Sequence, residues 1–167
     1  GDVFTPAYIC GRQRIYTVAG QENLGLPVIG RLLPYLGALP VPDTLPQMKR
    51  FLEAIRRKIT EKCCVVIYPE AHVWPYYTGI RPFPLTSFRF PVECDAPAFC
   101  MTTTYQKKRH GKEPQITVYI DGPFYPDKKL SKEEAQKKLH DEIFSCMQRR
   151  SLHSSYEYIR YREEKHP

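Results

Sequence analysis

The chain has 167 residues, and a hydrophobic content of 42% with 13% aromatic residues excludes an intrinsically disordered class. This length is enough for one domain with a core of its own. Lysine and arginine number 25 against 18 for aspartate and glutamate, so the formal net charge is +7. Such a charge favours a polyanionic neighbour, either nucleic acid or the anionic face of a membrane. No apolar run approaches the roughly 20 residues of a transmembrane helix, so we expect any membrane contact by this portion to be peripheral.

The six cysteines form no pattern that is typical of metal binding or cross-linking. No C-x-x-C pair is present, and Cys63 and Cys64 would point to opposite faces of a strand. Neither a zinc ribbon nor a disulfide framework is therefore predicted, and no metal site is expected. We expect free buried thiols in a reducing cytosol.

β-branched runs alternate with helical stretches, which predicts an α/β or α+β architecture in which helices cover a sheet. Residues 14–18 are predicted as a strand, and residues 24–39 form an apolar stretch that proline and glycine interrupt. A capping box at residues 44–47 predicts the start of an amphipathic helix with one basic face, ending near Lys62. Residues 63–68 are continuously apolar, as expected for an interior strand buried on both faces.

The second half of the chain predicts a hairpin followed by a closing helix. Residues 98–105 and 115–120 are strand candidates joined by a polar loop. Ser131 and Glu134 make a second capping box. One stripe of the closing helix is apolar and consists of Ala135, Leu139, Ile143 and Met147.

The expected domain ends where the alternation of strands and helices ends. Residues 1–150 are expected to form one α/β domain, and residues 151–167 a polar, tyrosine-rich tail. The first residue is Gly1 rather than Met, and a structural segment starts at once. We therefore expect the numbering to begin inside a longer protein.

The apolar run of residues 63–68 delivers Pro69 and Glu70 at its carboxyl end, which is the edge where open α/β sheets bind ligands. Glu70 is therefore a candidate site residue, although a glutamate after a strand can also only cap or solvate a loop. His72 is a second candidate, with a polar surface group as its alternative. Trp74, Pro75, Tyr76 and Tyr77 could form an aromatic lip for an acyl chain or an interfacial anchor, and ordinary packing under a loop is an equal alternative.

Five segments of the chain follow one another in this order: Gly25-Leu-Pro-Val-Ile-Gly30, Leu36-Gly-Ala-Leu-Pro-Val41, Tyr68-Pro-Glu-Ala71, Gly79-Ile-Arg-Pro-Phe83 and Ala96-Pro-Ala-Phe-Cys100. In order and spacing they resemble the glycerolipid acyltransferase family typified by 1-acylglycerol-3-phosphate acyltransferases. The first two together resemble the family's second conserved block, and the third resembles its Phe-Pro-Glu-Gly-Thr-Arg block. The fourth resembles the family's Pro-Phe-Lys segment, and the fifth its Val-Pro-Ile-Val-Pro-Val strand.

The resemblance implies an α/β fold with a mixed, mostly parallel sheet flanked by helices, and a transferase activity in phospholipid biosynthesis. It also implies a catalytic His-x-x-x-x-Asp motif, in which Asp2 is the aspartate and the histidine lies five residues earlier. The histidine would take the proton of the acceptor hydroxyl as it attacks an acyl thioester, while the carboxylate fixes its tautomer. Asp2 has an alternative role as the N-cap of a helix over residues 3–9.

The residues expected to bind the substrate are Pro69, Glu70, Ala71, His72 and Arg81. Two departures concern the phosphate of the acceptor. The family arginine that ends the second block falls on Asp43, and the one after Pro-Glu-Gly-Thr falls on Val73. Arg81 or Arg89 is a candidate for the missing charge, since a guanidinium suits phosphate. A different head group on the acceptor is the alternative.

The partners expected from the resemblance are an acyl-CoA or acyl-carrier-protein thioester as co-substrate, with no other cofactor, and a lysolipid-type acceptor. We expect a cytoplasmic protein bound peripherally to an anionic membrane surface. Two other functions are consistent with parts of the sequence. A catalytically degenerate relative could serve as a lipid-binding or scaffold module, and the net charge alone would suit a nucleic-acid-binding domain. The basic residues are dispersed and no nucleic-acid-binding motif is present, so we expect no nucleic-acid partner.

Overall fold

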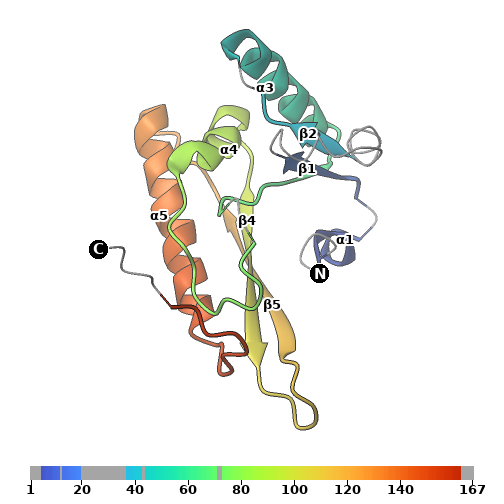
Figure 1. Ribbon diagram of the computed structural model, residues 1–167. Coiled ribbons are helices and arrows are strands. Elements are labelled where there is room, and N and C mark those ends of the chain that lie inside the picture. Colours follow the sequence, from blue (N-terminus) through green and yellow to red (C-terminus); the bar gives the residue numbers. More distant parts are fainter. Residues whose placement is uncertain (1–4, 12, 20–36, 43, 71–72, 163–167) are drawn as a thin grey trace, which may run out of the picture. The chain divides into compact units, whose positions relative to one another are not determined.

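The computed structural model describes residues 5–11, 13–19, 37–42, 44–70 and 73–162. Contacts divide the chain into two compact units, Gly1–Pro69 and Glu70–Pro167, each of which is described by itself (Figure 1). Both units combine helices with strands, and the first holds a parallel sheet. The predicted mixed α/β class is confirmed. The division into a domain over residues 1–150 and a polar tail stays a prediction.

The first unit is built on a three-stranded parallel sheet with the strand order β2-β1-β3. Thr17 in the central strand lies opposite Ala38 on one side and Val66 on the other. Parallel neighbours need a crossover, and the long helix α3 connects β2 to β3. The elements are α1 (Thr5–Ile9), β1 (Ile15–Ala19), β2 (Ala38–Pro40), α3 (Leu45–Thr60) and β3 (Cys64–Val66).

β3 differs from the strand predicted over residues 63–68. Only Cys64–Val66 pair with β1, and the chain then turns at Pro69. Among the described strands, β3 has β1 as its one neighbour and its residues are half-buried. The interior position of the sheet belongs to β1, so the prediction of an interior strand buried on both faces is wrong.

α3 begins at Leu45 as predicted, but its cap is different. The side chain of Thr44 makes no capping hydrogen bond, so the predicted capping box does not form. A proline in the first turn supports the start instead, because its missing N–H would have no intrahelical partner there. Phe51 and Ile55 are buried, which confirms that one face of this helix is apolar and packed.

Gly37 is required by the close approach of β1. It has a φ of +88°, and a Cβ atom built on it would lie 2.6 Å from the backbone oxygen of Ile15. Its own carbonyl accepts a hydrogen bond of 2.9 Å from the backbone N–H of Thr17. A side chain at this position would therefore meet main-chain atoms that the sheet holds in place.

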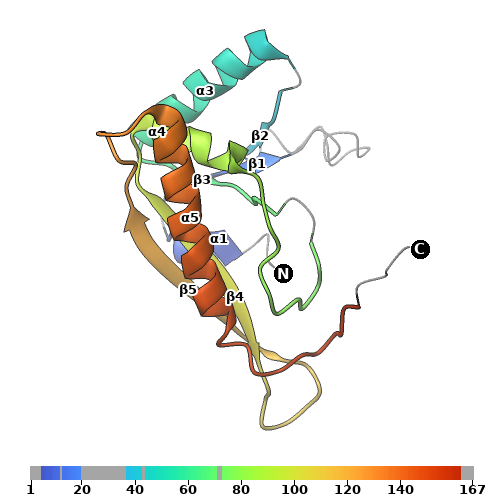
Figure 2. The same ribbon diagram turned by 90° about the vertical axis from the view of Figure 1, so that its left-hand side faces the viewer.

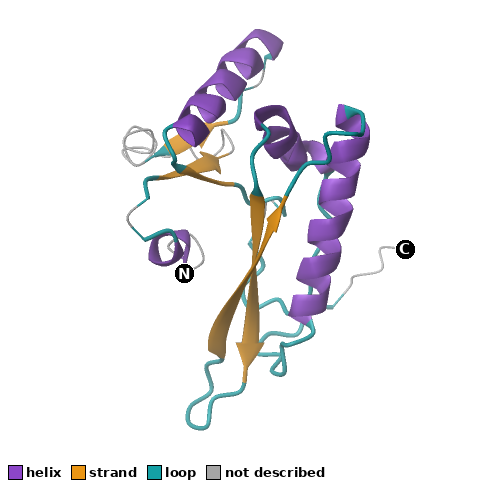
Figure 3. Cartoon of the chain, turned by 180° about the vertical axis from the view of Figure 1, so that it is seen from behind, coloured by secondary structure: helices purple, strands orange, loops and turns teal. Residues whose placement is uncertain are grey.

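The second unit is an antiparallel hairpin covered on one face by a helix. Thr104 of the first strand lies opposite Thr117 of the second, which confirms the predicted hairpin. The longest helix lies along one face of the hairpin (Figure 1, Figure 2 and Figure 3). The elements are η3 (Leu85–Phe88), α4 (Arg89–Cys94), β4 (Ala98–Gln106), β5 (Gln115–Phe124) and α5 (Lys132–Ser151).

α5 confirms both of its predicted features. Ser131 accepts a hydrogen bond from the backbone N–H of Glu134, and the Glu134 carboxylate accepts one from the backbone N–H of Ser131, 3.1 Å away. The predicted apolar stripe is buried between η3, α4 and β4. The core of the unit consists of Phe83, Phe88, Cys100, Leu139, Ile143, Cys146 and Met147. No helix within the described ranges has the length and hydrophobicity to cross a membrane.

Candidate functional site

The predicted site residues Glu70 and Arg81 are joined by three hydrogen bonds. The Arg81 Nε and its backbone N–H both donate to the Glu70 Oε2, at 3.1 and 3.3 Å. The Arg81 Nη2 donates to the backbone carbonyl of Glu70 at 3.1 Å. The side chain of Arg81 is 17% exposed and that of Glu70 is 27% exposed, so water screens this ion pair less than it screens a surface pair. These bonds close the loop of residues 70–81 and fix the plane of the guanidinium.

The guanidinium of Arg81 also contacts an aromatic ring. Its Cζ atom lies over the ring of Trp74, 4.8 Å from the ring centroid, which is within the range of a cation–π interaction. Trp74 in turn contacts Tyr77 edge-on, with centroids 5.3 Å apart. Arg81 is therefore held in its plane by a carboxylate and on its face by an indole.

The other predicted site residues are only partly described. Pro69 is the half-buried end of the first unit, next in sequence to Glu70. Asp2, Ala71 and His72 lie outside the described residues, and so does Asp43. Two positions that bear on the phosphate charge are described: Val73 is 71% exposed, and Arg89 opens α4 with an exposed side chain.

A histidine–aspartate pair is present in α5, but its geometry does not suit a general base. The Nδ1 of His140 lies 2.8 Å from the Asp141 carboxylate, and the Nε2 lies 3.1 Å from the backbone carbonyl of Phe83. Both ring nitrogens therefore already have partners within the second unit, and neither is directed at a substrate. The ring also packs among Phe83, Phe88 and Phe144. His140 is therefore a half-buried packing residue beside the core of the second unit.

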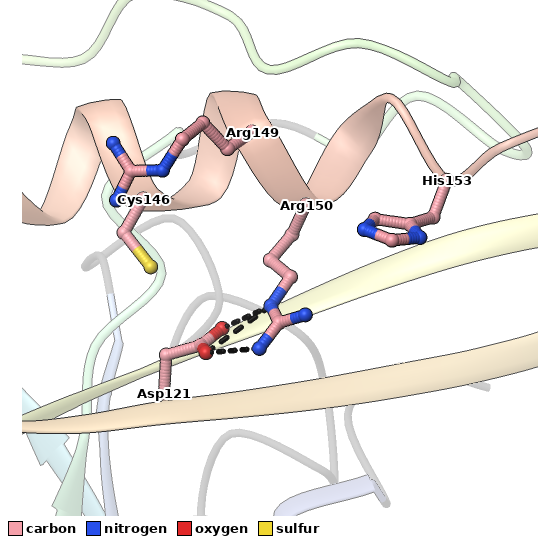
Figure 4. Close-up of a pocket in the computed structure, with 5 residues that line it drawn as sticks. All are labelled: Asp121, Cys146, Arg149, Arg150 and His153. Atoms are coloured by element: carbon pink, nitrogen blue, oxygen red, sulfur yellow. Dashed lines mark hydrogen bonds and ion pairs between the residues drawn. The ribbon is translucent and has the colours of Figure 1, made fainter.

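Cys100, Asp121 and Cys146 are the group that could hold a metal ion within the described part of the chain. Their ligand atoms all lie within 4.8 Å of one another. However, Arg150 donates three hydrogen bonds of 2.6–3.1 Å to both carboxylate oxygens of Asp121 (Figure 4). A cation at this position would have to displace the guanidinium, so the cluster is better explained as a polar contact between α5 and β5.

The protonation of this cluster agrees with a structural role. The hydrogen bonds from Arg150 lower the pKa of Asp121, so its carboxylate stays ionised. Burial, with a further contribution from Cys146, raises the pKa of Cys100 to about 12. Cys100 is therefore a thiol rather than a thiolate nucleophile near neutral pH.

Cys64 in the first unit is also a thiol near neutral pH, because burial and the neighbouring Cys10 raise its pKa to about 11.

A small pocket of about 170 Å³ opens beside the cluster of Cys100, Asp121 and Cys146. Figure 4 shows Asp121 and Arg150 facing each other in it, with His153 beyond the last turn of α5. The sequence did not indicate this pocket, because its residues come from β5 and from the end of α5. The lining residues are Asp121, Cys146, Arg149, Arg150 and His153.

One of three comparisons with known proteins finds a match. No family model matches the chain, and no curated protein sequence matches it. Among solved structures, the chain is similar to the 1-acyl-sn-glycerophosphate (LPA) acyltransferase PlsC from Thermotoga maritima, with a TM-score of 0.53 and 16% identity. The match covers 84% of this chain and 58% of the PlsC chain, so this chain spans a little over half of the length of PlsC. The resemblance found in the sequence is thus confirmed as a likeness of fold: over most of its length, the chain has the fold of an LPA acyltransferase.

Proposed function

We propose that this chain is part of an acyltransferase. It would move a fatty acyl group from an acyl-CoA or acyl-carrier-protein thioester to a lysophospholipid-type acceptor, as a step of phospholipid biosynthesis. The likeness of fold to PlsC supports an acyl-transfer reaction. The single observation that carries the proposal within the chain is the Glu70–Arg81 pair, because its members lie in two of the segments that resemble the family.

In this proposal Arg81 binds the anionic head group of the acceptor. A guanidinium is planar and permanently charged, and it can donate two parallel hydrogen bonds to a phosphate. Glu70 orients the guanidinium through the bonds described above. Arg81 would therefore supply the charge that the family places at the positions of Asp43 and Val73. Pro69, Ala71 and His72 would line the same substrate site.

The proposed reaction is a direct transfer without a covalent enzyme intermediate. A histidine five residues before Asp2 removes the proton from the acceptor hydroxyl, and the oxygen attacks the thioester carbonyl carbon. Asp2 orients that histidine and stabilises the imidazolium. The tetrahedral intermediate then expels the thiolate, which takes the proton back as the new ester forms. No cofactor besides the thioester co-substrate is part of this proposal.

The proposed place of the reaction is the cytoplasmic surface of a membrane. The exposed basic residues of α3 and of the loop at residues 107–112 suit anionic lipid headgroups, each near charge contributing about 1 kcal/mol. We propose no nucleic-acid partner.

A second candidate is a catalytically degenerate relative that binds lipid or serves as a scaffold. The observation that favours it is Val73, an exposed apolar side chain at a position where the resembling family has an arginine. The two proposals differ in turnover, because the scaffold would bind a lysolipid without transferring an acyl group to it.

The test uses the protein with the histidine proposed upstream of Asp2. It is incubated with an acyl-CoA and a panel of acceptors: lysophosphatidic acid, lysophosphatidylcholine and glycerol 3-phosphate. Product is measured by mass spectrometry, since six thiols in the chain would interfere with thiol-reactive dyes. We expect an acylated product that is lost when the histidine is replaced by alanine. Full turnover in the histidine variant would refute the proposed base, and lysolipid binding without any product would favour the scaffold.

A further inference from the structure

The segment that follows α5 packs against the loop that joins Glu70 to Arg81. The hydroxyl of Tyr161 donates a hydrogen bond of 2.8 Å to the backbone carbonyl of Pro75. The ring of Tyr161 stacks on Trp74, with centroids 5.0 Å apart and an interplanar angle of 19°. Figure 2 shows this segment (dark red) returning beside the loop (green).

A second tyrosine of the same segment holds the middle of the loop. Tyr158 contacts Tyr76 edge-on at 4.9 Å, and Tyr76 also contacts Tyr105 of β4 at 5.5 Å. Tyr76 has a φ of +60°, a conformation that residues other than glycine rarely adopt. Such a conformation persists where surrounding contacts hold it, and here two tyrosines supply those contacts.

The segment is itself anchored to the hairpin. The backbone N–H groups of Ser155 and Tyr156 both donate to the carbonyl of Tyr105, at 3.0 and 3.2 Å. The Ser154 hydroxyl accepts from the N–H of Tyr105 at 3.3 Å, and Gln106 donates to the carbonyl of His153. These bonds fix the start of the segment at the end of β4, so its tyrosines reach the loop from a defined position.

Contacts therefore run without interruption from Tyr161 through Trp74 and Arg81 to Glu70. We propose that Tyr161 and Trp74 are positioning residues for Arg81, and that they set the affinity of the site for an anionic head group. The inference rests on the proposed function, since it assigns Arg81 to the acceptor. It adds a determinant from the C-terminal segment, 80 positions beyond Arg81 in the sequence.

The physical reason is the conformational freedom of arginine. A long side chain that must be ordered on binding loses affinity, whereas one that is already fixed loses less. Trp74 restricts the guanidinium from its face, and Tyr161 in turn restricts Trp74. Without Tyr161, Trp74 would no longer be held over the face of the guanidinium, Arg81 would be restrained by Glu70 alone, and the head group would bind less tightly. The chemical step would be unaffected, because neither residue reaches the acyl carbon in this proposal.

Trp74 is the only tryptophan of the sequence, so its fluorescence reports on this contact directly. In the 167-residue chain we expect Tyr161→Ala to shift the Trp74 emission to longer wavelength, as the ring loses its cover. Tyr161→Phe keeps the stacking and removes only the bond to Pro75, so its spectrum should resemble that of the wild type. Tyr156→Phe is the matched control, because that hydroxyl donates to the carbonyl of Lys112 instead.

The same samples are then titrated with sn-glycerol 3-phosphate, the probe for the anionic head group. We expect a Kd about fivefold higher in Tyr161→Ala and within about twofold of wild type in Tyr161→Phe. In the active enzyme, Tyr161→Ala should raise the acceptor KM and leave kcat unchanged. If circular dichroism finds Tyr161→Ala unfolded, Trp74→Leu replaces it, with binding followed by calorimetry and the same loss expected.

The outcomes separate this inference from the proposed function. Wild-type binding that Arg81→Ala abolishes, but that Tyr161→Ala leaves unchanged, would overturn the positioning role and keep the acceptor site. An unshifted Trp74 spectrum in a folded Tyr161→Ala variant would also overturn it. Absence of glycerol 3-phosphate binding in the wild type would overturn the assignment of Arg81 to a phosphate, and the inference with it.

Discussion

Arg150 in the last turn of α5 donates three hydrogen bonds to Asp121 of β5 and so ties the closing helix to the hairpin (Figure 4). The Asp121 side chain is 15% exposed, which limits its access to water. A carboxylate in this position needs its partner, because an unpaired charge away from water is costly. The pair therefore stabilises the second unit rather than forming a site.

Asp121→Asn should lower the free energy of unfolding by about 1–3 kcal/mol at pH 7, since charged hydrogen bonds of this kind contribute in that range. Urea denaturation measures this loss of unfolding free energy. Asp127→Asn is the control: Asp127 pairs with Lys138, whose side chain is 48% exposed, so this variant should lose less stability than Asp121→Asn. Equal losses for the two variants would contradict the role given to Asp121.

The effect of Asp121→Asn should also depend on pH. The pKa of Asp121 is lowered in the folded chain by the bonds from Arg150, so folding favours its ionised form. The stabilisation is therefore fully present above the unfolded pKa of about 4 and is lost as the pH falls through the folded value. The difference between wild type and Asp121→Asn should shrink when urea curves are repeated below pH 4. A stability difference between wild type and Asp121→Asn that grows as the pH falls would contradict this role of Asp121.

Gly37 provides a test of the parallel sheet. Gly37→Ala places a methyl group 2.6 Å from the backbone oxygen of Ile15, at a positive φ. Gly111→Ala has a φ of +90° as well, but no atom lies within 4 Å of the added Cβ. We expect Gly111→Ala to cost about 1–2 kcal/mol from the backbone alone. Gly37→Ala should cost about 1–3 kcal/mol more because of the clash. Equal thermal unfolding of the two variants would mean that Gly37 does not meet β1 in this way.

The two helix caps form a matched pair. Ser131→Ala removes a side chain that accepts from the backbone N–H of Glu134, so we expect a loss of about 1 kcal/mol. Thr44→Ala removes a hydroxyl that makes no capping bond, and its loss should be only a few tenths of a kcal/mol. Chemical denaturation compares them. A larger loss for Thr44→Ala would show that the first capping box forms after all.

Local sequence signals predicted the second unit best. In α5 the structure has both the predicted cap at Ser131 and the predicted apolar stripe. Each of these features depends only on residues close together in the sequence. In the first unit the burial of β3 depends on the order of the strands in the sheet. The apolar run of residues 63–68 gives no information about that order. β2 was missed because Ala38–Pro40 has three residues and includes a proline.

The candidate site was predictable only in part. Glu70 was predicted from its place after the apolar run of residues 63–68, and Arg81 from the resemblance of the segment around it. Their direct bond is a tertiary contact over 11 positions, which no local pattern specifies. Tyr161 contacts the carbonyl of Pro75 across 86 positions, so the sequence showed it only as part of a tyrosine-rich tail.

Membrane binding has a charge test on α3. Lys49, Arg50 and Arg56 are exposed on this helix. Reversing all three to glutamate should weaken sedimentation of the chain with phosphatidylserine vesicles by about tenfold or more, at about 1 kcal/mol for each basic residue. The control exchanges the same positions between lysine and arginine, which keeps the charge. Unchanged sedimentation of the reversed variant would remove this helix from the proposed membrane surface.

The most direct test of the central claim is the acceptor KM of the active enzyme with lysophosphatidic acid, in Arg81→Ala and Arg89→Ala. Loss of a bidentate charged contact to a phosphate should raise the acceptor KM about tenfold or more in Arg81→Ala. The KM for the acyl-CoA should stay the same. Arg89→Ala should change both values by less than about twofold, because Arg89 lies exposed at the start of α4. An acceptor KM that Arg81→Ala leaves unchanged would contradict the proposed acceptor site.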